Sequence, residues 1–100
     1  MTAKTKIWID DIRKPPDNTF AWCIDYNSAI WMIRAMMHCK GIDYISFDHD
    51  LGEEKSGYDI AKFIVENHIP IKEYKVHSAN PVGRFNIEQL LNHYGYKKHN

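Results

Sequence analysis

The sequence predicts a single α/β domain in which a parallel sheet is covered by helices. Short apolar segments alternate with longer amphipathic ones, which is the pattern of strand–helix–strand units. The chain has 100 residues and shows no internal repeat or low-complexity linker. Residues 1–100 are therefore expected to form one domain.

Charge and hydropathy argue against two classes of partner. The 13 basic and 13 acidic residues balance, so no general attraction to duplex DNA or to an acidic membrane is expected. No apolar segment is long enough to span a bilayer, and the first residues lack the core of a signal peptide. We therefore expect a cytoplasmic protein that makes no membrane contact.

The predicted strands are short. They are expected at residues 6–9, 21–24, 44–48 and 74–78. Pro15 and Pro16 keep a helix out of the connection between the first two strands. That connection is close to the minimum length for a parallel crossover, which makes the second strand the weakest of the four.

Three helices are expected between and after these strands. The first follows a cap at Asn27 or Ser28 and presents an apolar face as far as Met37. The other two are expected at residues 57–68 and 86–94. The residues that stop the three helices are Gly41, Pro70 and Gly95. The tryptophans are expected to lie in the core: Trp8, Trp22 and Trp31.

Reactive side chains follow three of the predicted strands. They are Asp10 and Asp11 after the first strand, Asp48, His49 and Asp50 after the third, and His77, Ser78 and Asn80 after the fourth. The carboxyl ends of parallel strands lie at one edge of a sheet, and open α/β proteins bind their ligands there. We therefore expect these three segments to form one site.

Carboxylates gathered at one edge need a partner of opposite charge. Two carboxylates about 4 Å apart repel by roughly 4 kcal/mol at an effective dielectric of about 20. No lysine is expected at this edge, and the nearest basic residues are Arg13 and Arg84. A divalent cation therefore fits, with Mg²⁺ first because its ligands are oxygens and Mn²⁺ as the alternative because histidines lie nearby. Ser78 and Asn80 also have a purely structural interpretation, as caps of the helix that follows.

The same segments carry three longer motifs. Trp8 to Pro16 has the pattern W-x-D-D-x-R-x-P-P, Ser46 to Gly52 has S-x-D-H-D-L-G, and His77 to Gly83 has H-S-A-N-P-x-G. Through these motifs the chain resembles, nearly end to end, the cyclic-phosphate-processing receiver-like domains. These are divergent relatives of the receiver domains of two-component response regulators. The resemblance implies a small three-layer receiver-like (flavodoxin-like) fold with a four-strand parallel sheet, truncated and lacking the fifth strand.

In receiver domains an acidic pair binds Mg²⁺, an aspartate is phosphorylated and a hydroxyl contacts the phosphoryl group. The resemblance places these roles on Asp10 and Asp11, on Asp48 and on Ser78. The phosphate-binding lysine of the fifth strand and the first helix are both missing here. Asp50 and His77 have no counterpart in the receiver pattern.

A metal-assisted phosphoesterase acting on a cyclic phosphate is the first functional hypothesis. The substrate would be a 2′,3′-cyclic-phosphate RNA 3′ end or a cyclic nucleotide signal. The expected metal ligands are Asp10, Asp11, Asp48 and Asp50, the expected catalytic residues are Asp48, His49 and His77, and the expected phosphate-binding residues are Arg13, Ser78, Asn80 and Arg84. His49 or His77 would move protons, since histidine titrates near neutral pH. A covalent aspartyl-phosphate on Asp48 is a variant of this hypothesis.

Two other functions remain open from the sequence. The chain would sequester a cyclic nucleotide immune signal without turnover, as a phage anti-defence protein does, or it would act as a receiver switch phosphorylated at Asp48. The exposed edges of a four-strand sheet also predict a homodimer.

Overall fold

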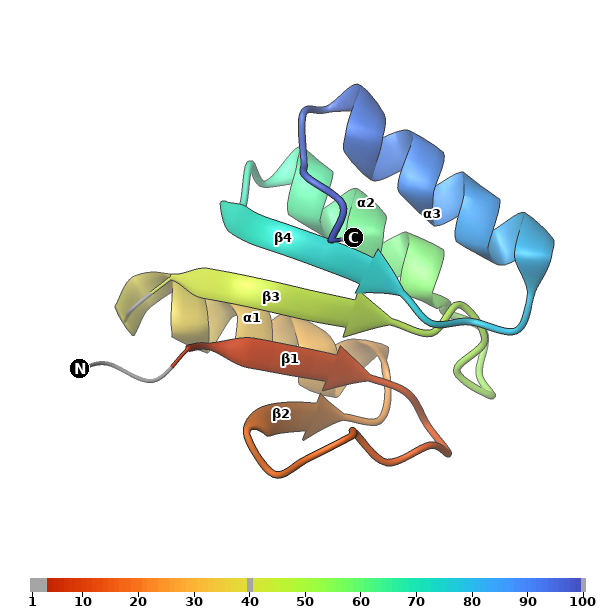
Figure 1. Cartoon of the computed structure of the whole chain (residues 1–100), viewed down its shortest axis with the longest axis horizontal. Coiled ribbons are helices and arrows are strands. Elements are labelled where there is room, and N and C mark those ends of the chain that lie inside the picture. Colours follow the sequence, from red (N-terminus) through yellow and green to blue (C-terminus); the bar gives the residue numbers. More distant parts are fainter. Residues whose placement is uncertain (1–3, 40, 100) are drawn as a thin grey trace.

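The computed structural model describes residues 4–39 and 41–99. Its strands are β1 (Lys6–Ile9), β2 (Phe20–Cys23), β3 (Ile42–Phe47) and β4 (Ile71–Val76). Its helices are α1 (Tyr26–Cys39), α2 (Gly57–Glu66) and α3 (Pro81–His93). The strands form one parallel sheet in the order β2-β1-β3-β4, as Figure 1 shows. The predicted truncated receiver-like α/β fold with a four-strand parallel sheet is confirmed.

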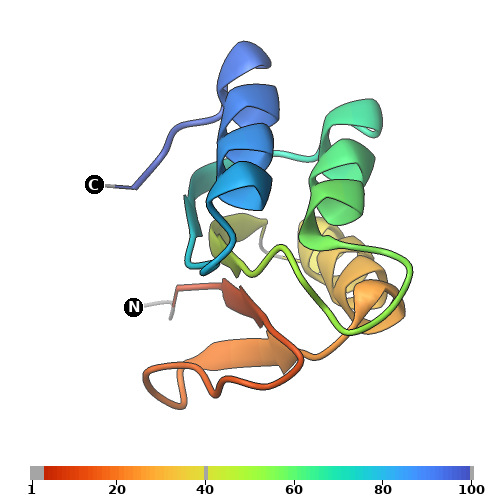
Figure 2. The same ribbon diagram turned by 90° about the vertical axis from the view of Figure 1, so that its right-hand side faces the viewer.

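The three helices lie side by side on one face of the sheet. α1 packs on α2 and α2 packs on α3, and Figure 2 shows the other face without a helix. The side chains beneath the helices are buried: Ile7, Ile9, Ile45, Phe47, Tyr74 and Val76. The described residues therefore form two layers, not the three that the resemblance implied. Both helical crossovers run in the same direction across the sheet, and right-handed crossovers of that kind place their helices on one face.

One rung of pairing lies where a fifth strand would run. The N–H of Tyr74 donates to the carbonyl of Lys97 (3.0 Å), and the N–H of His99 donates to the carbonyl of Tyr74 (2.7 Å). These bonds form a parallel bridge between Tyr74 and Lys98 outside the four strands. The end of the described chain therefore covers the outer edge of β4.

Two helix starts differ from the prediction. Helix α1 is capped by Asp25, whose Oδ1 accepts from the N–H of Ser28 (2.8 Å), and not by Asn27 or Ser28 themselves. Helix α3 begins at Pro81, well before residue 86, because the Asn80 side chain accepts from the N–H of a first-turn residue. Proline is favoured in the first helical turn, where no backbone donor is needed. The capping interpretation of Asn80 is thus confirmed.

The tryptophans do not form the core. Trp22 is 42% exposed and Trp31 is 69% exposed, while Trp8 is half-buried on the face without helices. The core instead consists mainly of isoleucines between the sheet and the helices. Among the described residues no helix has the length and apolar character needed to cross a membrane.

Candidate functional site

The backbone aligns the ends of β1, β3 and β4. The N–H of Asp10 donates to the carbonyl of Cys23, that of Asp48 to the carbonyl of Ile9, and that of His77 to the carbonyl of Phe47, at 3.1, 2.8 and 2.8 Å. Each donor is therefore in the first position past its strand and is still bonded to the neighbouring strand. The predicted convergence of distant segments at one sheet edge is what the structure shows.

Three carboxylates meet at this edge. One oxygen from each of Asp10, Asp11 and Asp48 lies within 4.8 Å of the other two. Asp10 and Asp48 are buried, with 1% and 7% of their surface exposed, and Asp11 is half-buried. A cleft of about 340 Å³ opens above them, and Arg13 and Asp50 also line it. We call this the acidic cleft.

Asp10 is held by three donors. Its Oδ1 accepts from the N–H groups of Ile12 and Arg13, both at 2.9 Å, and its Oδ2 accepts from His77 Nε2 at 3.0 Å. Burial acts to raise the pKa of Asp10, but these hydrogen bonds outweigh it and hold the pKa below the ordinary value of 3.8. Asp10 is therefore a fixed carboxylate. Asp11 and Asp48 also line the acidic cleft, and each contributes one carboxylate oxygen to the cluster.

His77 is locked between two partners. Its Nε2 must donate, because the carboxylate of Asp10 only accepts, and its Nδ1 then accepts from the hydroxyl of Ser46 at 2.7 Å. The indole of Trp8 stacks on the imidazole with ring centroids 3.9 Å apart. Burial lowers the pKa of His77 despite the opposing effect of Asp10, which keeps the ring neutral. These contacts suit a residue that orients Asp10.

His49 has a different environment. Its Nδ1 lies 3.0 Å from Asp50 Oδ1, and its side chain is 22% exposed. Asp50 is itself held by Asn80, whose Nδ2 donates to Oδ2 at 3.3 Å. The hydrogen bonds from His49 and Asn80 lower the pKa of Asp50. Asp50 thus lines the acidic cleft but pairs with a histidine, and it does not belong to the three-carboxylate cluster.

Three glycines pack tightly against the site. A Cβ on Gly52 would lie 2.7 Å from an Asp11 carboxylate oxygen, and a Cβ on Gly57 would lie 2.1 Å from the Asp48 carbonyl oxygen. A Cβ on Gly83 would lie 2.3 Å from Cγ of the His49 ring. Gly52 also has a φ of 68°, which glycine tolerates best. These glycines were not predicted as site residues from the sequence, although the motifs contain Gly52 and Gly83.

Two tryptophans hold the loop that carries Arg13. The indole N–H of Trp22 donates to the carbonyl of Asp10 (2.7 Å), and that of Trp8 donates to the carbonyl of Arg13 (2.9 Å). The Arg13 guanidinium lies 3.8 Å from Asp10 Oδ2 and donates to the carbonyl of His77 at 3.3 Å. Arg13 therefore lies at the rim of the acidic cleft, as expected.

Two predicted phosphate-binding residues lie elsewhere. Arg84 lines a separate cleft with Lys75 and Glu88, so its position does not support contact with a ligand in the acidic cleft. Ser78 is buried, and its Oγ accepts from the N–H of Asn80 at 3.1 Å. This bond stabilises the turn before α3, whereas the helix itself is capped by Asn80 and not by Ser78.

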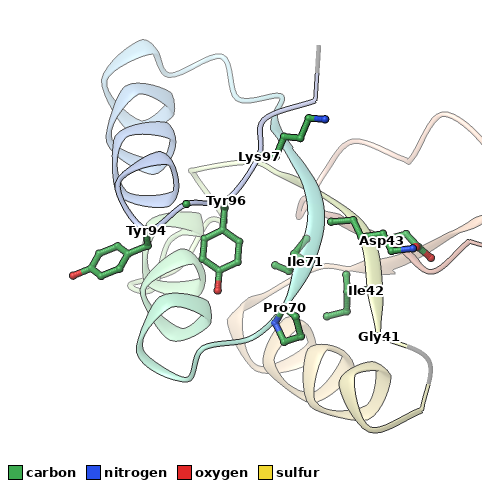
Figure 3. Close-up of a pocket in the computed structure, with 10 residues that line it drawn as sticks. Gly41, Ile42, Asp43, Pro70, Ile71, Tyr94, Tyr96 and Lys97 are labelled. Atoms are coloured by element: carbon green, nitrogen blue, oxygen red, sulfur yellow. The ribbon is translucent and has the colours of Figure 1, made fainter.

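A larger cavity lies away from this chemistry. It has a volume of about 470 Å³ and lies at the amino ends of β3 and β4, where Ile42, Ile71 and Tyr96 line it (Figure 3). The acidic cleft is at the carboxyl ends of the same strands. Cavity size therefore does not identify the candidate site, and the carboxylate cluster does.

The donor set of the acidic cleft fits a hard cation. Carboxylate oxygens are the ligands that Mg²⁺ takes in proteins, usually with several waters. The described cluster contains oxygen donors from Asp10, Asp11 and Asp48 and no thiolate. The residues present are therefore compatible with the Mg²⁺ expected from the sequence.

Comparison with known proteins identifies the family. A family model described as the cyclic-phosphate processing receiver domain matches residues 5–93, which include every strand and helix of the structure. Searches of curated proteins and of solved structures found no match. The chain belongs to the family of cyclic-phosphate processing receiver domains.

Proposed function

We propose that the protein is a phosphoesterase that opens a cyclic phosphate with the help of a divalent cation. The observation that carries this proposal is the meeting of Asp10, Asp11 and Asp48 within 4.8 Å. These three residues would hold Mg²⁺, with Mn²⁺ as the alternative. A cation bound there would polarise a phosphoryl oxygen and lower the pKa of a bound water. The family description supports a cyclic phosphate as the substrate class.

His49 is a better candidate for proton transfer than His77, although its ring packs against Gly83 and does not itself line the acidic cleft. With Nδ1–H donated to Asp50, its Nε2 has a free lone pair and can take a proton from water or return one to a leaving oxygen. Asp50 would orient the ring in this tautomer. Both nitrogens of His77 are engaged, so we assign His77 the task of positioning Asp10.

Arg13 would bind the phosphate. Its side chain is 54% exposed at the rim of the cleft, and a guanidinium can donate two parallel hydrogen bonds to phosphoryl oxygens. The hydrogen bond from Arg13 to the His77 carbonyl limits where the guanidinium can point. Arg13→Lys would keep the charge and lose the paired geometry.

The test is product formation. RNA ending in a 2′,3′-cyclic phosphate and a panel of cyclic dinucleotides are incubated with the protein, with Mg²⁺, with Mn²⁺ and with chelator. We expect metal-dependent opening of the cyclic phosphate, abolished by Asp48→Asn and retained by Glu66→Gln. Glu66 is an exposed acid at the far end of α2 and controls for loss of one negative charge.

Other outcomes point to the other functions. A ligand that is retained and recovered intact would contradict the enzyme and support sequestration of a cyclic nucleotide. Labelling of Asp48 by acetyl phosphate, without turnover of any cyclic phosphate, would support the phosphorylated switch.

A further inference from the structure

One face of the sheet has no helix over it. Side chains on this face align across the strands, with Lys6 beside Phe20 and Tyr44 at one level and Trp8 beside Trp22 at the next. Figure 1 looks onto this face, with α1 and α2 behind the strands. We define the bare face by the side chains that project from it: Lys6, Trp8, Phe20, Trp22, Tyr44, Glu73 and Lys75.

Aromatic rings form a continuous row across the bare face. Trp8 stacks on His77 at 3.9 Å and meets Phe20 at 5.7 Å, Phe20 meets Tyr44 at 5.9 Å, and Tyr44 meets His99 at 5.3 Å. At one end of the row, His77 is hydrogen-bonded to Asp10 of the acidic cleft. The row therefore begins at the candidate active site and crosses to the opposite end of the sheet.

Basic side chains accompany the rings. The Lys6 ammonium lies 4.4 Å from the centre of the Phe20 ring, and Lys75 is exposed on β4. At the far end of the row, Lys4 and Lys72 line a hollow of about 400 Å³ together with Tyr44 and His99. Two acids also line it: Asp43 pairs with Lys72 at 3.1 Å, so this pair adds no net charge, and Glu73 pairs with His99 at 3.3 Å. Lys4, Lys6 and Lys75 therefore give this aromatic face a small positive excess in a chain of zero net charge.

These features select one occupant. A single-stranded polynucleotide matches both properties, because its bases pack on aromatic rings and its phosphates pair with lysines. The most exposed ring of the face is that of Trp22, whose indole is bonded to the Asp10 carbonyl beside the cleft.

We propose that the bare face binds a single-stranded polynucleotide and directs its phosphate end into the acidic cleft. This inference rests on the proposed phosphoesterase function and narrows its substrate from any cyclic phosphate to the end of a polynucleotide. The rings and lysines would contact nucleotides that precede the reacting phosphate. A cyclic mononucleotide would fill the cleft alone and make none of these contacts.

Binding is measured without turnover. The protein is titrated into a fluorescent single-stranded RNA of about ten nucleotides, in the presence of chelator. A single-stranded DNA of the same sequence and the corresponding duplex are titrated separately. We expect Lys75→Glu to weaken single-strand binding by about tenfold at low salt, and the control Lys62→Glu, an exposed residue of α2, by less than about twofold. Tyr44→Leu keeps apolar bulk, removes a ring and should also weaken binding. Equal losses for Lys75→Glu and Lys62→Glu, or no binding by the unaltered protein, would overturn the proposal.

A second measurement separates this inference from the function beneath it. Turnover of a cyclic mononucleotide and of an RNA with a cyclic end is compared with metal present. Preference for the RNA that Lys75→Glu removes supports both proposals. Equal kcat/KM for the two substrates refutes the inference and leaves the phosphoesterase function standing. RNA binding without turnover of either substrate refutes the phosphoesterase function and leaves binding by the bare face standing. A dimer in light scattering that Tyr44→Leu dissociates would show a second copy on the bare face and overturn the inference.

Discussion

Replacing Asp48 by asparagine should have opposite effects on stability with and without metal. Two unit charges 4.8 Å apart, the limit for the three clustered carboxylates, repel by about 3.5 kcal/mol at an effective dielectric of 20 and by about 0.9 kcal/mol in water. Asp48 takes part in two such pairs, with Asp10 and with Asp11. The cleft is open to solvent and Asp10 is held by hydrogen bonds, so the lower value governs.

In chelator we therefore expect Asp48→Asn to raise the free energy of unfolding by about 1 to 2 kcal/mol, which is about 4 to 16 °C in Tm for a domain of this size. Mg²⁺ at about 100 times its Kd should stabilise the unaltered protein by about 2.7 kcal/mol. The variant should lose most of that gain.

The assay is thermal unfolding followed by circular dichroism at neutral pH, in chelator and across a series of Mg²⁺ concentrations. Glu66→Gln removes an exposed negative charge remote from the cluster and should respond to Mg²⁺ like the unaltered protein. Destabilisation of Asp48→Asn in chelator would show that the carboxylates do not repel one another. An equal Mg²⁺ shift in all three proteins would show that they do not share a cation.

Three further predictions concern the residues around the cluster. Burial lowers the pKa of His77, so the unfolded chain binds a proton that the folded chain refuses. Stability should be complete above pH 6.5, the ordinary pKa of histidine, and should fall as the pH drops toward the folded-state pKa, with His77→Gln reducing this fall in urea titrations in chelator. Gly83→Ala should destabilise by about 1 to 3 kcal/mol and impair turnover, because its Cβ would overlap the His49 ring; unchanged urea midpoints would contradict this. Asn80→Ala should cost about 1 kcal/mol by removing the cap of α3, and Asn80→Ser should restore most of it.

The site was more predictable than the layers around it. Asp10, Asp48 and His77 were expected together because a parallel sheet aligns the carboxyl ends of its strands, and the backbone bonds past each strand show this alignment. The partition of roles could not be predicted, because it depends on side-chain contacts. Ser46 and Trp8 immobilise His77, whereas Asp50 leaves one nitrogen of His49 free.

The missing layer left a trace in the sequence. Strands buried on both faces are nearly continuous hydrophobic runs, whereas a strand with one open face alternates. In β4, Glu73 and Lys75 alternate with buried Tyr74 and Val76. In β1, the partly exposed Lys6 and Trp8 alternate in the same way with buried Ile7 and Ile9. The predicted strand at residues 74–78 began three residues after the start of β4 and so left out Glu73, the first polar residue of this alternation that faces Tyr44. Arg84 was misplaced because its helix begins at Pro81 and its side chain therefore lies in another cleft.

The distance between Asp10 and Asp48 is set by the sheet and not by the loops that follow them. Each is the residue after a strand, and the two strands are neighbours in which Ile9 pairs with Phe47, so the distance between the two backbones is the spacing common to all sheets, about 4.8 Å. The connecting segments can lengthen, shorten or exchange residues while the two acids keep their places. Grafting foreign loops between Arg13 and Phe20, or after Asp50, should therefore change which molecules reach the acids and leave the acids themselves in register.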